Sequence, residues 1–120
     1  MNTLQTTEKD FEEFKTECTR LIDVFGIRNY IVLFDHKKDM ISSYATIEVS
    51  HENRQAMISL GAIRLEDPDT LKKSALHEII HLIFGRLSWL ASCRWCTEDE
   101  VDEEGENLSV LFENVLFGKI

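Results

Sequence analysis

Two histidines and a glutamate within five consecutive residues are the side chains of this sequence best suited to chemistry. His77 and His81 are four residues apart, and Glu78 directly follows the first histidine. On an α-helix, four residues turn the chain about 40° beyond a full circle, so both imidazoles lie on one face. Neutral imidazole is a good zinc ligand, and a nearby carboxylate can accept the proton of a zinc-bound water. The pattern predicts that His77 and His81 bind Zn²⁺ and that Glu78 is the catalytic base.

The surrounding sequence predicts the helix that this spacing requires. Asp67 is a good capping residue, and Pro68 after it suits the first helical position. We expect a broad apolar stripe on this helix to be buried, formed by Leu76, Ile79, Ile80, Ile83, Leu87 and Leu90. The structural alternative is that the two histidines only flank a buried helix and hydrogen-bond to nearby backbone or carboxylate groups.

A catalytic zinc site normally has three protein ligands and an open position for water. No histidine follows the motif at the position where a third one would complete one known arrangement. We therefore look for a carboxylate in the acidic run at 98–106, which lies at the start of another predicted helix. As a structural alternative, such a run is a solvated helix start favoured by the helix dipole.

Helical periodicity selects Glu104 from this run. The apolar residues of this helix are Val101, Leu108, Leu111, Phe112, Val115 and Leu116. Glu104 falls on the same face, whereas Glu103 points to the far side and Glu100 is the natural partner of Thr97 in a capping box. A carboxylate on an apolar face is costly unless it is paired or bound to metal. We expect Glu104 to be the third ligand, with Glu100 and Glu103 as alternatives, and Gly105 to permit close approach of the helix backbone.

The remaining elements predict an α+β fold in a single domain over residues 1–120. Phe11, Phe14, Cys18, Leu21, Ile22 and Phe25 recur at helical spacing, between a cap at Thr7 and a terminating Gly26. Three short strands follow, over Tyr30–Phe34, Ser43–Val49 and Gln55–Leu60. We expect them to form a small three-stranded antiparallel sheet, packed on the N-terminal helix, the long motif helix and the C-terminal helix.

Composition limits the classes of partner. The chain has 13 basic and 22 acidic residues, a formal charge of -9, which disfavours nucleic acids and anionic membranes as partners. No stretch approaches the roughly 20 apolar residues of a membrane span, and Met1–Thr7 does not resemble a signal peptide. We expect a cytoplasmic protein whose cysteines are reduced.

Two further features receive ordinary structural interpretations. Cys93 and Cys96 form a lone Cys-x-x-Cys pair, which we interpret as loop thiols, with a metal knuckle, an oligomer contact or redox chemistry as alternatives. His36 and His51 lie near predicted turns and are expected to be exposed.

The order of helix, small sheet, His-Glu-x-x-His helix and glutamate-bearing helix resembles the minimal zincin fold of the glutamate-liganded type. The most similar set is that of short metallopeptidase-like proteins encoded in phage genomes, and the resemblance extends from about Tyr30 to Leu116. It implies a Zn²⁺-dependent peptidase acting on a protein or peptide, in the host cytoplasm if phage-encoded. By this resemblance, His77 and His81 match the metal ligands, Glu78 the general base, and Glu103-Glu104 the acidic pair that supplies the third ligand.

The sequence departs from this resemblance in two ways. No tyrosine or further histidine is marked by the sequence as the group that stabilises an oxyanion, and only the five-residue motif is specific. By analogy with the fold, an extended peptide would pair with an exposed sheet edge, for which Gln55–Leu60 is the candidate strand.

The competing functions are a non-catalytic zinc-containing binding protein, such as a phage factor that docks on a host protein, and an acidic mimic of DNA.

Overall fold

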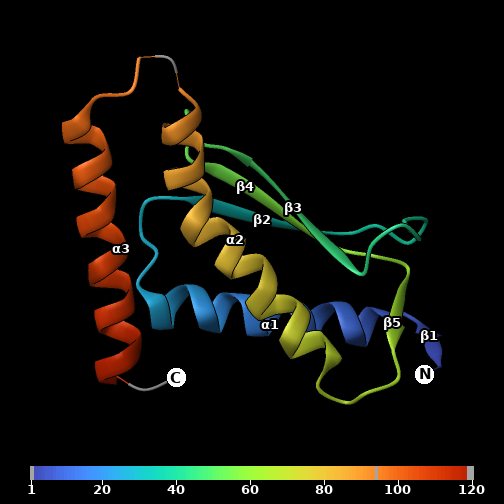
Figure 1. The fold of residues 1–120 in the computed structure, drawn as a ribbon. Coiled ribbons are helices and arrows are strands. Elements are labelled where there is room, and N and C mark those ends of the chain that lie inside the picture. Colours follow the sequence, from blue (N-terminus) through green and yellow to red (C-terminus); the bar gives the residue numbers. More distant parts are fainter. Residues whose placement is uncertain (1, 94, 119–120) are drawn as a thin grey trace.

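The computed structural model describes residues 2–93 and 95–118, in which three helices pack with two small sheets (Figure 1). The elements in chain order are β1 (Thr3–Gln5), α1 (Glu8–Phe25), β2 (Ile31–His36), β3 (Ala45–Ser50), β4 (Gln55–Leu60), β5 (Ile63–Leu65), α2 (Thr70–Ser92) and α3 (Glu98–Gly118). The mixture of three helices with two small sheets in these ranges confirms the α+β class.

The three-stranded sheet is mixed, so the prediction of an antiparallel sheet is wrong. Its order is β2-β4-β3; β2 runs parallel to β4, and β3 runs antiparallel to it. β2 and β3 are consecutive in the chain but are not neighbours in the sheet, because β4, which follows both in sequence, lies between them. Strand periodicity fixes which residues share a face but not which strands are neighbours. β4 is therefore the central strand, with both of its edges paired.

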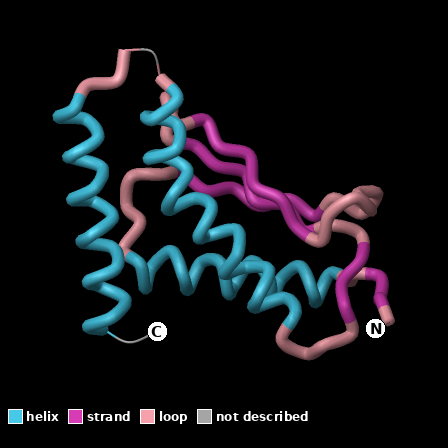
Figure 2. Tube along the Cα trace, viewed as in Figure 1, coloured by secondary structure: helices cyan, strands magenta, loops and turns pink. Residues whose placement is uncertain are grey.

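A second sheet was not predicted. β1 pairs antiparallel with β5, and this two-stranded ladder lies at the end of the molecule near the N-terminus (Figure 2). Each strand has only three residues, too few to show an alternating pattern. Arg64 of β5 forms an ion pair with Asp10 of α1, with 3.2 Å between Nε and Oδ2, which links the ladder to the first helix.

The predicted boundaries of α1 are confirmed. The Thr7 side chain accepts a hydrogen bond from the Asp10 backbone, and the Asp10 carboxylate accepts one from the Thr7 N–H. At the other end Gly26 has φ 74, the left-handed conformation that closes a helix. Four residues of the predicted apolar face are buried: Phe14, Cys18, Leu21 and Phe25.

The hydrophobic core lies between one face of the three-stranded sheet and the helices (Figure 1). Ala56 and Ile58 of β4 point into it, and the neighbouring Val32 and Phe34 of β2 pack against it. On the opposite face, Ile31 and Leu33 of β2 are exposed. Covering only one face fits the alternating pattern of the strands.

α2 begins later than predicted. Asp67 does not cap it; its Oδ1 accepts a hydrogen bond from the Asp69 backbone, and the helix starts at Thr70, with Pro68 outside it. Of the six residues expected in the buried stripe, Ile79, Ile83 and Leu90 are buried, and Leu87 is partly buried. Leu76 and Ile80 are exposed, because the apolar residues extend further round the helix than the core does.

α3 starts with the predicted capping box. The Thr97 hydroxyl accepts a hydrogen bond from the Glu100 backbone, while Glu100 accepts one from the Thr97 N–H. Among the predicted buried residues of α3, Glu104, Leu108 and Val115 are buried and Leu111 is partly buried. Val101 and Phe112 are exposed, and the side chain of Leu116 lies outside the described residues. Over the described ranges, none of the helices combines the length and the apolar character that crossing a membrane demands.

Candidate metal centre

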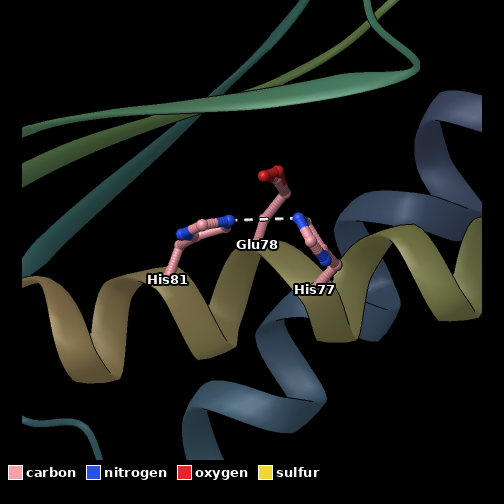
Figure 3. Close-up of side chains that lie close together, drawn as sticks. All are labelled: His77, Glu78 and His81. Atoms are coloured by element: carbon pink, nitrogen blue, oxygen red, sulfur yellow. Dashed lines mark hydrogen bonds between the residues drawn. The ribbon is translucent and has the colours of Figure 1, made fainter.

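α2 brings the two motif histidines together. The Nε2 atoms of His77 and His81 are 3.0 Å apart, and their ring centroids are separated by 4.6 Å. Figure 3 shows both rings rising from the same side of α2, with Glu78 between them and its carboxylate directed toward the strands. As predicted from the four-residue spacing, the two imidazoles face each other across one turn.

This arrangement fits a zinc ion. Two nitrogen ligands at 2.0–2.1 Å from a tetrahedral ion lie about 3.3 Å from each other, close to the separation of the two Nε2 atoms. A carboxylate oxygen of Glu78 completes a group of three possible ligand atoms that all lie within 4.8 Å of one another. Both histidines are exposed, so an ion and a further ligand can reach them from solvent.

Glu78 differs from the histidines in its surroundings. The residue is only 4% exposed, and burial raises the pKa of its carboxyl group, although the neighbouring His77 and His81 act in the opposite direction. A carboxyl group in this environment holds a proton more readily than one in water. This is the property expected of a group that must take up and then release a proton.

The structure does not bring Glu104 into this group. Glu104 is buried, as predicted, but its Oε1 lies 3.4 Å from Nε of Arg86, and the two side chains are only 9% and 18% exposed. The group of possible ligands at the motif contains His77, Glu78 and His81 among the described residues. The alternatives Glu100 and Glu103 are both exposed, and Glu100 is engaged in the capping box.

Arg86 and Glu104 belong to a second cluster, which joins α2 and α3 to the sheet. Arg86 also donates to the backbone carbonyl of His51, and its guanidinium lies 5.1 Å from the ring centroid of Trp89. His51 stacks on Trp89 and shares a hydrogen bond of 2.8 Å with Tyr30. The cluster borders a cavity of about 230 Å³ between α2, α3 and the segment that leads into β2.

The expectation that His36 and His51 are exposed is wrong. His36 stacks on Phe11 and is within hydrogen-bonding distance of Thr6, 2.8 Å from its hydroxyl. Both histidines are partly buried because His36 packs on Phe11 of α1 and His51 packs on Trp89 of α2. Burial lowers the pKa of His51, and the charges of Arg86 and Arg54 lower it further.

A pocket beside the motif was not foreseen from the sequence. It has a volume of about 480 Å³, and its walls include His77, Glu78 and Tyr44, the residue just before β3. Tyr44 is 41% exposed, so its hydroxyl is a candidate donor to a bound molecule. The sequence gives no signal for this, since Tyr44 is more than 30 positions from the motif and reaches it only through the packing of β3 against α2.

The three cysteines are free, as expected. Cys18 is buried in the core, which raises the pKa of its thiol to about 12 and makes it unreactive. Cys93 and Cys96 are partly buried in the connection between α2 and α3. Neither belongs to a group of possible metal ligands within the described part of the chain.

Among known proteins, no family model, curated protein or solved structure matches this chain. The resemblance to zincins therefore gains no support from these comparisons.

Proposed function

We propose that the protein is a zinc-dependent peptidase in which Glu78 is the general base. The observation that carries this proposal is the convergence of His77 and His81, with 3.0 Å between their Nε2 atoms, beside a buried carboxylate. In this proposal the two Nε2 atoms hold the metal. A bound zinc ion polarises a carbonyl oxygen and lowers the pKa of a water molecule toward about 7.

The remaining roles in catalysis are assigned to residues of the chain. The Glu78 carboxylate takes up the proton of the attacking water and transfers it to the departing amine. The exposed faces of His77 and His81 leave room for a substrate carbonyl. Glu104 would have to leave Arg86 to contribute a third ligand, so its role is tested separately below.

An extended peptide fits the free edge of β3 better than the strand chosen from the sequence. Gln55–Leu60 is the central strand β4 and has no free edge, which corrects that prediction. β3 is an edge strand that packs against α2. Its pairing with β4 directs the backbone N–H and C=O groups of Ala45, Ile47 and Val49 outward, following the bond from Gly61 N to Tyr44 O. A peptide paired there would lie alongside the motif helix.

The competing function, a zinc ion used only for folding, is disfavoured by exposure. Structural zinc sites are usually closed by four protein ligands. The motif histidines are instead open to solvent, and beside them is a pocket.

The proposal is tested with Glu78→Gln, which keeps the shape of the side chain but removes the base. We expect cleavage of a fluorogenic peptide mixture to fall by about 10²- to 10⁴-fold while zinc content is unchanged. Glu113→Gln, at an exposed position on α3, is the matched control and should retain full activity. Undiminished cleavage by Glu78→Gln would show that this carboxylate is not the base.

A further inference from the structure

The pocket beside the metal group has walls from three parts of the chain. The first turns of α2 contribute Thr70, Lys73 and Ser74, and the segment that enters β3 contributes Ser43 and Tyr44. Leu65 of β5 and Ala45 add aliphatic surface. Because His77 and Glu78 form part of the same wall, a group held in the pocket lies next to the candidate metal centre.

The polar groups of this pocket include several that can donate hydrogen bonds. Ser43, Tyr44 and Ser74 contribute hydroxyls, and within the described ranges no hydrogen bond to another side chain or to backbone occupies these hydroxyls. Lys73 contributes an ammonium group. Glu78 is the one acid in the pocket wall, and it belongs to the group of possible metal ligands. The pocket therefore suits a ligand that accepts hydrogen bonds.

Charge favours an anionic ligand at this place. The chain carries a net charge of -9, so most of its surface repels anions, whereas Lys73 places a cationic side chain in the wall of this pocket. Lys73 is paired with Asp67 at 3.4 Å, but its side chain is 71% exposed. An exposed pair of this kind contributes little to stability, so the ammonium group can turn toward a ligand at small cost.

We propose that this pocket binds a carboxylate of the peptide substrate, next to the bond to be cleaved. The aliphatic wall accommodates methylene groups, while Lys73 and the hydroxyls contact the carboxylate. Two sources have this chemistry: a glutamate side chain and the C-terminal carboxylate of a peptide. The substrate assignment rests on the proposed peptidase function, but binding of the carboxylate does not require turnover.

Binding is measured first, without reference to activity. N-acetyl-glutamate amide and its neutral isostere N-acetyl-glutamine amide are titrated into the zinc-loaded protein and followed by amide NMR. We expect the acid to shift the amide signals of 43–45 and 70–74 and to bind about two- to fivefold more tightly than the isostere. Equal affinity for the two probes, or shifts confined to other segments, would overturn the inference.

Lys73→Met removes the charge and keeps the length of the side chain, and it should abolish the preference for the acid. Lys72→Met is the matched control, since Lys72 is an adjacent exposed lysine outside this pocket, and it should keep the preference. Lys73→Glu should reverse the preference in favour of a lysine-containing probe. An unchanged preference in Lys73→Met would exclude Lys73 as the cationic partner.

Cleavage then separates the two sources of the carboxylate. Amidated peptides with an internal Glu or Gln test the side chain, and one peptide with a free or amidated C-terminus tests the terminal group. We expect one pair to differ in KM by about two- to fivefold, and Lys73→Met to remove that difference. If no peptide is cleaved but the acid still binds, the peptidase proposal fails and the carboxylate site stands. Cleavage without either preference refutes the carboxylate site alone.

Discussion

For Glu104, the sequence predicts burial of the carboxylate but not the group that partners it. The helical periodicity of 98–116 predicts that Glu104 faces inward, and its 7% exposure confirms this. A buried carboxylate needs a cation, but that cation can be a metal or an arginine. Arg86 lies eight positions after Glu78 on the same long helix as the motif, and the sequence alone does not show whether packing supplies the arginine or a metal as the partner of Glu104.

Glu104→Gln tests which cation Glu104 serves. Because the change leaves Arg86 without its carboxylate in a mostly buried site, we expect the free energy of unfolding to fall by about 1–3 kcal/mol. Zinc content should be unchanged. Urea denaturation and atomic absorption measure the two quantities, with the exposed Glu106→Gln as control. Loss of zinc from Glu104→Gln would restore this residue as a metal ligand.

His51 links protonation to stability. The pKa of His51 is lower in the folded state than its ordinary value of about 6.5. Between these two pKa values, the unfolded chain binds more protons than the folded chain does. The contribution of His51 to stability is therefore present above that range and lost as pH falls through it. We expect the stability difference between the wild type and His51→Gln to shrink between about pH 8 and about pH 5.5. The free energy of unfolding of both proteins is measured by denaturation at each pH. A difference between them that stays constant over this range would contradict the lowered pKa of His51.

At the scale of elements, local signals were predictable and long-range pairings were not. Thr7 with Gly26, and Thr97 with Glu100, mark helix ends through contacts within a few residues, and the structure confirms them. The insertion of β4 between β2 and β3 depends on how the whole chain packs, which periodicity does not encode. The motif helix was predicted, whereas the pocket walls from Ser43–Ala45 depend on this unpredicted topology.

Two glycines make a matched test of this topology. A Cβ atom on Gly61, directly after β4, would lie 2.3 Å from the backbone oxygen of Ser43, whereas one on Gly105 in α3 meets nothing within 4 Å. The prediction that Gly105 permits close backbone approach is therefore wrong. We expect Gly61→Ala to destabilise the protein by about 1–3 kcal/mol, as overpacking does. Gly105→Ala should stabilise it by up to about 1 kcal/mol, since alanine favours the helix.

Thermal and urea unfolding measure both glycine variants. If Gly61→Ala were as stable as the wild type, the close approach between the end of β4 and the segment entering β3 would be in doubt. The NMR signals of Ser43 and Tyr44 should also shift in Gly61→Ala, because this segment must move to admit the methyl group.

At the scale of the whole molecule, α2 connects the core to the candidate metal centre. Ile79 and Ile83 of α2 are buried in the hydrophobic core, while His77 and His81 emerge from the same helix into solvent. The core therefore fixes the direction of the helix, and the helix fixes the distance between the imidazoles. This part of the site follows from sequence because a single element contains it.

Zinc content of the purified protein tests the central claim most directly. After incubation with zinc and removal of excess metal, we expect one tightly bound zinc ion per chain in the wild type and in His51→Gln. We expect none in His77→Ala or His81→Ala, with helix content preserved by circular dichroism. A folded wild-type protein that retains no zinc, or histidine variants that retain it fully, would contradict the metal centre.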